Sequence, residues 1–177
     1  ETNWLITNGK YAYQYDEAGN MVAKGNVYTL DGETVEFDKR QDEENLANGE
    51  KVKYWEYEYN LQGRLSKVYK NGELIAEFTY DASGQRIRTI RHDKSGNVEK
   101  EVDYVYSYRG QVLVEKNTTE DKYTSYIYAF EKKFAKIEGT VDDYFAEDIE
   151  VEINYFHHDN LGSTRVMTDG QGKVVMD

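Results

Sequence analysis

Cysteine, proline and long hydrophobic runs are all missing from this sequence of 177 residues. Without cysteine, no disulfide holds the fold together. Without proline, every residue after the first keeps the backbone N–H that a sheet ladder needs, which favours an almost continuous β-sheet. No segment approaches the roughly 20 apolar residues of a membrane-spanning helix, so we expect no insertion into a membrane.

The charge balance is strongly acidic, with 34 Asp and Glu against 22 Lys and Arg and a net charge of −12. Nucleic acids and anionic membranes are bound by Lys and Arg patches, so this balance disfavours both partners. Aromatic residues make up 14% of the chain and include 17 tyrosines. This content suits β-strands and argues against a disordered chain.

One phrase recurs along the chain: two aromatic residues one position apart, then Asp or Asn, then Gly three residues later. Tyr59 and Tyr80 are 21 positions apart, and Tyr15 and Tyr59 are 44 apart, or twice 22. A fixed period of this kind indicates a repeat architecture. The clear copies consist of Tyr13, Tyr15, Asp16 and Gly19; of Tyr57, Tyr59, Asn60, Gly63 and Arg64; and of Phe78, Tyr80, Asp81 and Gly84.

The same period predicts further, degenerate copies of the phrase. One is expected near position 37, where Val35–Asp38 has the pattern without its Gly. Others follow at 104–110 and 126–128, and the last spans 155–162. We therefore count seven units, of which three are clear.

Each unit reads as a pair of short strands. Aromatic residues at i and i+2 lie on the same face of a strand. The Asx-x-x-Gly that follows predicts a type I turn closed by a Gly with positive φ, as in hairpins with a bulge. Asn71-Gly72 predicts a tighter two-residue turn between strands at 66–70 and 73–79. The expected fold is all-β: antiparallel hairpin repeats of about 20–22 residues that form a curved, spiralling sheet.

Two segments interrupt the pattern. Residues 39–50 are rich in charge, and although Lys39–Asn48 is the best helix candidate, we interpret the segment as an inserted acidic loop. Residues 129–150 mix aromatic and charged residues and are compatible with a short helix or with a pair of strands. The predicted organisation is thus degenerate repeats over 1–154 and a distinct closing motif over 155–177. The sequence starts at Glu1 without Met and stops within an expected strand, so we expect a piece of a larger protein.

No pattern in the chain indicates catalysis or a bound cofactor. Nucleophile motifs and phosphate-binding loops are absent. His157, His158, Asp159 and Asp169 suggest a metal cluster, but adjacent residues of a strand point to opposite faces, so we predict no metal there. The Asp-rich turns lack the ligand series of a calcium loop. We interpret the acidic run 142–148 as a solvent-exposed surface, with weak surface calcium binding as the alternative.

The repeated phrase resembles the YD repeats of the Rhs family. The closing segment, Tyr155 to Asp169, resembles the start of the Rhs-associated core, and includes His157, His158, Asp159, Gly162, Ser163 and Arg165. This family includes bacterial polymorphic toxins, C components of insecticidal toxin complexes, wall-associated proteins and teneurins. The resemblance implies a long β-sheet that spirals into a hollow shell, which in toxins encloses a variable C-terminal effector. The self-cleaving segment of such proteins would lie beyond Asp177, so no catalytic residue is carried over.

We therefore expect a non-enzymatic, structural role: a wall segment of a secreted or cell-surface protein. Its expected partners are the remainder of the parent chain, an encapsulated effector, and a second copy paired edge to edge. Seven repeats are too few to close a shell alone. The alternative is an adhesion module whose Tyr-rich faces bind a glycan or a protein. Exposure distinguishes the two, because binding needs Tyr13, Tyr57 and Phe78 to form a wet stripe, whereas a wall needs them packed.

Overall fold

The computed structural model describes residues 4–32, 34–38, 51–140, 151–159 and 161–176, and these contain strands, turns and no helix. The fold is therefore all-β, as the sequence predicts. No helix long and apolar enough to span a membrane occurs among the described residues. The strands are β1 (Ala12–Tyr15), β2 (Met21–Gly25), β3 (Tyr28–Asp31), β4 (Thr34–Phe37), β5 (Tyr54–Tyr59), β6 (Leu65–Lys70), β7 (Glu73–Tyr80), β8 (Arg86–His92), β9 (Val98–Tyr106), β10 (Val112–Asn117), β11 (Lys122–Ala129), β12 (Lys132–Thr140), β13 (Glu152–His158), β14 (Thr164–Asp169) and β15 (Val174–Met176).

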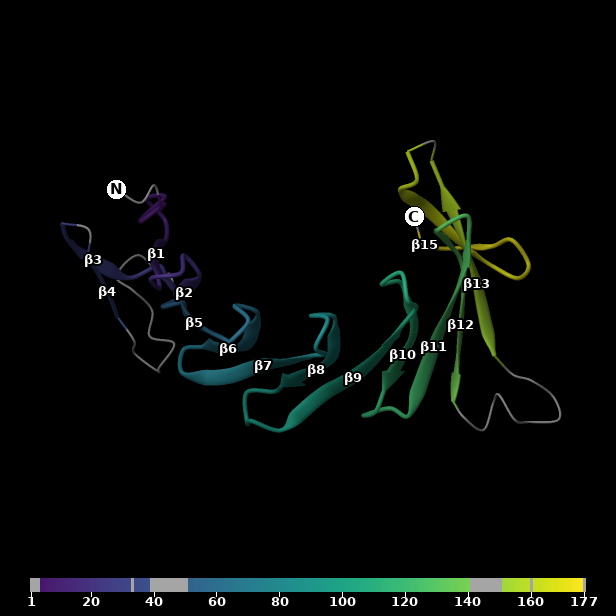
Figure 1. Ribbon diagram of the computed structural model, residues 1–177, viewed down its shortest axis with the longest axis horizontal. Coiled ribbons are helices and arrows are strands. Elements are labelled where there is room, and N and C mark those ends of the chain that lie inside the picture. Colours follow the sequence, from purple (N-terminus) through teal and green to yellow (C-terminus); the bar gives the residue numbers. More distant parts are fainter. Residues whose placement is uncertain (1–3, 33, 39–50, 141–150, 160, 177) are drawn as a thin grey trace. The chain divides into compact units, whose positions relative to one another are not determined.

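Thirteen of these strands form one hydrogen-bonded sheet in the order β1-β2-β5-β6-β7-β8-β9-β10-β11-β12-β13-β14-β15. Apart from the step from β2 to β5, neighbours in the sheet are neighbours in the sequence, and the pairs are antiparallel wherever the register is defined. The strands and their turns can be followed in Figure 1. The backbone therefore satisfies its hydrogen bonds mainly through local hairpins.

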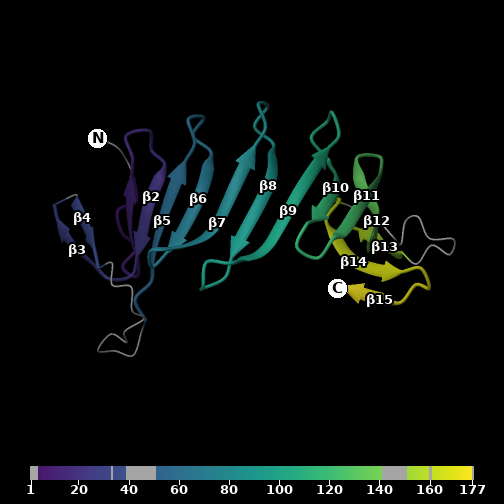
Figure 2. The ribbon, with the colours of Figure 1, turned by 90° about the horizontal axis from the view of Figure 1, so that it is seen from below.

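The chain divides into two compact units, and the boundary passes through β7, β8 and β9. The first unit comprises Glu1–Thr79 and Ile90–Glu99, and the second comprises Tyr80–Thr89 and Lys100–Asp177. In the first unit, the β1–β2 and β5–β6 turns lie at one end of the strands and the β6–β7 turn lies at the other (Figure 2). The Asx-x-x-Gly turns of the β1–β2 and β5–β6 hairpins thus lie at the same edge of the sheet (Figure 2).

The β3–β4 hairpin lies where the sequence predicts a repeat of the main sheet, but it is not part of that sheet. The sequence places a worn unit of the main sheet near Phe37, and a strand does form there, but it pairs only with β3 in a separate two-stranded sheet. β2 pairs directly with β5 instead, with Gly25 opposite Tyr54. The acidic loop and helix candidate of residues 39–50 lie outside the described residues.

The β3–β4 hairpin packs against the main sheet of the first unit at Gly25 and Tyr54. The Phe37 and Tyr54 rings are 5.2 Å apart. Gly25 lies beneath Phe37, where an added Cβ would come within 2.6 Å of the ring. The buried apolar residues of this unit are Ala12, Ala23, Val35, Val52 and Tyr54. The hairpin contributes Val35 to this small core, and its Phe37 packs on the sheet beside it.

The second unit is thinly packed by comparison. Its buried apolar residues are Val102, Ala135 and Met167, and most other side chains on its strands are half-buried. Residues 132–140 of the irregular stretch form β12, which pairs with β11 from Lys122–Thr140 to Ala129–Lys132. This decides in favour of a strand pair for that part of the stretch, while residues 141–150 lie outside the described residues.

Candidate functional site

The repeated turn has the same hydrogen bonds at every copy. In the first, the Asp16 N–H donates to the Asn20 carbonyl at 2.9 Å, and the Gly19 N–H donates to the Asp16 carbonyl at 3.0 Å. Gly19 has a φ of 86°, a left-handed conformation that only Gly adopts without strain. These are the bonds of a type I turn followed by a bulge. The same pair of backbone bonds closes the turns that begin at Asn60, Asp81, Asp93, Ser107, Asp159 and Asp169.

The first side chain of each turn holds the turn closed. Asp16 Oδ1 accepts a hydrogen bond of 2.8 Å from the Asn20 N–H, four residues on. The six other turns have the equivalent bond, to a carboxylate, amide or hydroxyl oxygen. The side chain thus satisfies a backbone donor that the bulge leaves unpaired. Ser107 forms this turn although the sequence phrase names only Asp and Asn.

Hydrogen bonds to the ionised form lower the pKa of the turn carboxyls. Asn20 lowers the pKa of Asp16 mainly through its side-chain amide, and Ser83 does the same for Asp81 through its hydroxyl. For Asp159 the largest cause is the backbone N–H of Ser163, followed by the Arg165 guanidinium. Each of these carboxyls therefore stabilises its turn as a charged acceptor.

A tyrosine near the end of the first strand of a hairpin links that hairpin to the previous one. The Tyr59 hydroxyl donates to the Met21 carbonyl at 2.9 Å, and Tyr128 donates to Val112 at 2.9 Å. Tyr106 donates to the Arg86 carbonyl at 2.7 Å. In all three pairs the acceptor lies two residues after the closing residue of an earlier turn (Gly19, Gly84 or Gly110). We call this bond the tyrosine latch.

The tyrosines that form the latch are partly buried. The pKa values of Tyr59, Tyr106 and Tyr128 are all raised, in each case chiefly because burial disfavours the phenolate. The hydroxyl therefore keeps the proton that it donates. A ring that packs on the sheet while its hydroxyl bonds the backbone explains why tyrosine, and not phenylalanine, suits this position.

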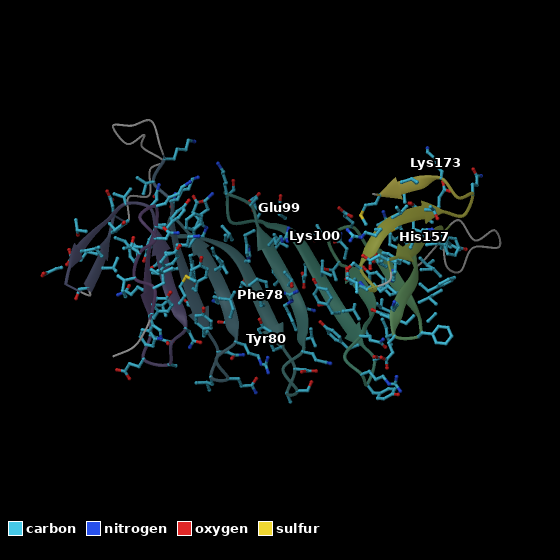
Figure 3. All side chains as sticks on the ribbon, turned by 90° about the horizontal axis from the view of Figure 1, so that it is seen from above. Phe78, Tyr80, Glu99, Lys100, His157 and Lys173 are labelled. Atoms are coloured by element: carbon cyan, nitrogen blue, oxygen red, sulfur yellow. The ribbon has the colours of Figure 1, made fainter. Side chains whose placement is uncertain are left out.

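The closing motif forms another turn of the same kind and brings no metal ligands together. Asp159 Oδ1 accepts from the Ser163 N–H at 2.9 Å, and Arg165 Nε donates to Asp159 Oδ2 at 2.9 Å. His157, labelled in Figure 3, lies on β13 and contacts the Thr168 hydroxyl at 2.9 Å through Nε2. His158 is half-buried, and its Nδ1 has no hydrogen-bond partner among the described residues. Among the described residues, no group of three His, Asp or Glu side chains is arranged to hold a metal ion.

The aromatic residues of the clear repeats are neither fully exposed nor fully buried. Tyr13, Tyr57 and Phe78 are half-buried, as is Tyr80, two residues after Phe78 on β7 (Figure 3). Tyr13 and Trp55 flank Lys24 in the sheet. The Lys24 ammonium lies 5.4 Å from the Trp55 ring centroid and 4.5 Å from that of Tyr11. A lysine of the chain itself thus fills the space between these rings.

A hollow in the first unit lies beside the buried Tyr54 and Ala23. Its volume is about 560 Å³, and it is lined by Gln14, Val22, Ala23, Tyr54, Glu56, Tyr57, Glu58, Tyr69 and Gly72. Burial is the main cause of a raised Tyr69 pKa, and hydrogen bonding to Glu58 adds to it. Aromatic rings beside carboxylates and an amide form a surface that suits a polyhydroxylated ligand.

Sequence reasoning missed two asparagines that hold the chain where it enters β5. Asn71 Oδ1 accepts from the Tyr54 N–H at 2.8 Å, and its amide donates to the Val52 carbonyl at 3.2 Å. From the other side, Asn26 bonds the Lys53 N–H and the Lys51 carbonyl. The two side-chain amides thus make the backbone hydrogen bonds that neighbouring strands would otherwise make. The Asn71-Gly72 phrase indicated only the turn, which does form with φ values of 51° and 83°.

Comparison with known proteins supports the fold alone. No family model matches the sequence, and no curated protein matches it. Among solved structures, the chain is similar to the crystal structure of TcdB2-TccC3-Cdc42, with a TM-score of 0.60, 16% identity, and coverage of 90% of this chain and 8% of that chain. The crystal structure of TcdB2-TccC3 without its hypervariable C-terminal region gives the same values. The chain thus has the fold of a small segment of those much longer chains.

Proposed function

We propose that this chain is a structural segment in the wall of a large Rhs/YD-repeat protein that is secreted or displayed on the cell surface. In this role the segment has no catalytic activity, and its sheet continues into the rest of the parent chain to form a cage around, or a display platform for, a C-terminal effector. The observation that carries the proposal is the recurrence of one set of bonds: the repeated turn closes seven hairpins, and the tyrosine latch joins a hairpin to the previous one in three places.

Two further features support this role. The similarity to TcdB2-TccC3 covers 90% of this chain, so the whole chain is consistent with a piece of one continuous sheet. The half-buried aromatic residues of the repeats also suit packing better than they suit a wet binding stripe. A wall of this kind gains rigidity because neighbouring hairpins bury the faces that a single hairpin cannot.

The two faces of β11 offer a direct test in the parent protein, since the 177 residues contain no natural cysteine. Lys122 and Ile127 are both exposed, and because they are five positions apart, they lie on opposite faces of the strand. In a closed shell, a bulky maleimide should label cysteine at one of these positions and not at the other, whereas a small maleimide should label both. Equal labelling of Lys122→Cys and Ile127→Cys by the bulky reagent would contradict an enclosing wall.

The strand order also bears on self-association. Among the strands that the structure describes, β15 has one hydrogen-bonded neighbour, β14, and its Val174, Val175 and Met176 are about half exposed. At the other end, β1 is bonded on its outer side, where the Tyr13 N–H donates to the Ile6 carbonyl at 2.9 Å. We expect β15 to pair with further chain or with a second copy. A concentration-dependent dimer that Val175→Lys abolishes would identify the second copy.

The hollow beside the core favours a second candidate function, an adhesion module for a glycan. Three tyrosines and two carboxylates line it, which are the groups that stack and hydrogen-bond sugars. In a glycan array, a hit that Tyr69→Ala removes without changing the unfolding temperature would support this function. An array without hits would leave the structural role as the better account.

A further inference from the structure

Three neighbouring turns of the second unit each expose a large apolar side chain. The exposed fractions are 91% for Tyr108 in the β9–β10 turn, 98% for Phe130 in the β11–β12 turn and 92% for Leu161 in the β13–β14 turn. Alternate turns of an antiparallel sheet lie at the same edge, and Figure 1 shows all three at one edge of this unit. We call these three side chains the apolar row.

Contacts between the turns fix the order of the row. Arg109 Nη1 bonds Glu131 Oε1 at 2.9 Å, which joins the first turn to the second. A Cβ on Gly162 would come within 3.1 Å of Lys132 Cε, which joins the second turn to the third. Successive turns are two strands apart, and strand spacing places them about 10 Å from one another. The row therefore consists of separate projections, not of one continuous patch.

The middle of the row is held in an unfavourable backbone conformation. Phe130 and Glu131 have φ values of 49° and 66°, so the β11–β12 turn is of the two-residue kind in which Asn and Gly are favoured. A bulky aromatic residue in this conformation destabilises the free protein. Phe130 thus has a strained backbone and an almost fully exposed side chain that contributes nothing to the core. This combination indicates a contact with another molecule.

Cationic side chains accompany the row. Arg109 and Arg165 pair with Glu131 and Asp159 beside the row, and Lys132 lies next to Gly162, so these five side chains together carry a net charge of +1. The whole chain has a net charge of −12. The Arg109 guanidinium also lies 5.3 Å from the Tyr108 ring centroid and donates to its hydroxyl at 2.7 Å. The row thus combines apolar tips with cations in an otherwise acidic molecule.

We propose that the apolar row is a peripheral contact site for the surface of a zwitterionic lipid bilayer. Aromatic and leucine side chains enter the region between lipid headgroups, and lysine and arginine bind the lipid phosphates. Separate, convex projections suit a fluid interface, because a protein partner would need three matching pockets at fixed spacing. The negative charge of the whole chain opposes attraction to anionic lipid, so the expected lipid is phosphatidylcholine. The contact is superficial and spans nothing.

Flotation with phosphatidylcholine vesicles tests the proposal on the 177-residue chain. We expect the chain to float with the vesicles, and Tyr108→Ser, Phe130→Ser and Leu161→Ser each to weaken partitioning by about tenfold. Val174→Ser is the control within the same unit, since Val174 is about half exposed and follows the β14–β15 turn, at the other end of β14 from Leu161, and it should leave partitioning unchanged. As a second measurement, the fluorescence of Phe130→Trp should shift to the blue when vesicles are added.

Four results would overturn the proposal. The first is a chain that does not float, and the second is a triple Ser variant that floats as well as the original. The third is binding that needs anionic lipid and disappears with salt, which would assign it to charge alone. The fourth is a dimer that the triple variant abolishes while vesicles have no effect, which would assign the row to a second copy of the chain.

Discussion

The Tyr59 hydroxyl donates a hydrogen bond of 2.9 Å to the carbonyl of Met21, 38 residues earlier in the chain. The bond joins the end of β5 to the beginning of β2 and so crosses from one hairpin repeat to the one before it. Tyr128 makes the equivalent bond to Val112 in the second unit. Neighbouring repeats are therefore held together by a side chain as well as by the strand ladder.

Removing the latch hydroxyl should weaken the joint between repeats. We expect Tyr59→Phe and Tyr128→Phe each to lower the free energy of unfolding by about 1 kcal/mol, because a partly buried carbonyl loses its donor while the ring stays in place. Tyr108→Phe is the control, since it also loses a hydroxyl but is 91% exposed. Urea unfolding measures the difference. Equal stability of all three variants would show that the latch contributes nothing.

Replacing Asn71 should loosen the entry into β5. Asn71→Ala leaves the Tyr54 N–H and the Val52 carbonyl without partners in a buried place, and we expect a loss of about 1–3 kcal/mol. Asn71→Gly separates this effect from the positive φ, because Gly accepts the turn conformation and lacks the amide. Amide exchange at Tyr54 should accelerate in both variants. Native exchange in Asn71→Gly would assign the role of Asn71 to the turn alone.

A methyl group at Gly25 should displace the β3–β4 hairpin. The added Cβ would lie 2.6 Å from Phe37 Cδ1, and overpacking of this kind costs about 1–3 kcal/mol. Gly170→Ala is the matched control, since nothing lies within 4 Å of its Cβ position and it should leave the unfolding temperature almost unchanged. Combining Gly25→Ala with Phe37→Ala should remove the clash. If the double variant equals the sum of the two single losses, the two residues do not interact.

Giving the β11–β12 turn a favoured sequence should stabilise the chain. Phe130→Asn together with Glu131→Gly replaces two strained residues by the pair that this turn prefers, and we expect a gain of about 1 kcal/mol. Tyr108→Asn is the control, because Tyr108 is equally exposed and has no positive φ to relieve. Thermal unfolding measures both. A gain of the same size in the control would mean that removing an exposed ring, and not relief of strain, is the cause.

Acid should destabilise the turns that begin with Asp. Asp16, Asp81, Asp93 and Asp159 all have pKa values below the ordinary 3.8. Because the folded pKa is the lower one, their contribution to stability is complete above about pH 4 and is lost as the pH falls through 3.8 and towards the folded values. The unfolding temperature should therefore drop steeply below about pH 4.

Asparagine tests the cause of that acid effect, because it keeps the acceptor oxygen without titrating. Asn60 already closes its turn in this way, with Oδ1 accepting from the Arg64 N–H at 3.0 Å. Changing the four aspartates to Asn should flatten the acid side of the stability profile while the turns persist. An unchanged acid slope would place the titrating groups elsewhere in the chain.

The local structure of this protein followed from its sequence because it depends on neighbouring residues. An Asx residue four positions before its backbone donor and a Gly with positive φ are enough to specify a turn. The Asp16–Gly19 and Asn60–Gly63 turns were predicted on that basis and form as expected. The hairpin at Asn71-Gly72 was predicted for the same reason.

The tertiary structure alone decided which distant groups meet. The period of 21–22 residues placed a unit at Val35–Asp38, but only packing determined that this hairpin leaves the main sheet and covers Gly25. The acceptor of Tyr59 and the partners of Asn71 lie 38 and 17–19 residues away in the sequence, beyond the reach of any local pattern. The sequence by itself thus determined the hairpins and their turns through short-range hydrogen bonding. Contacts between residues far apart in the chain required the folded sheet.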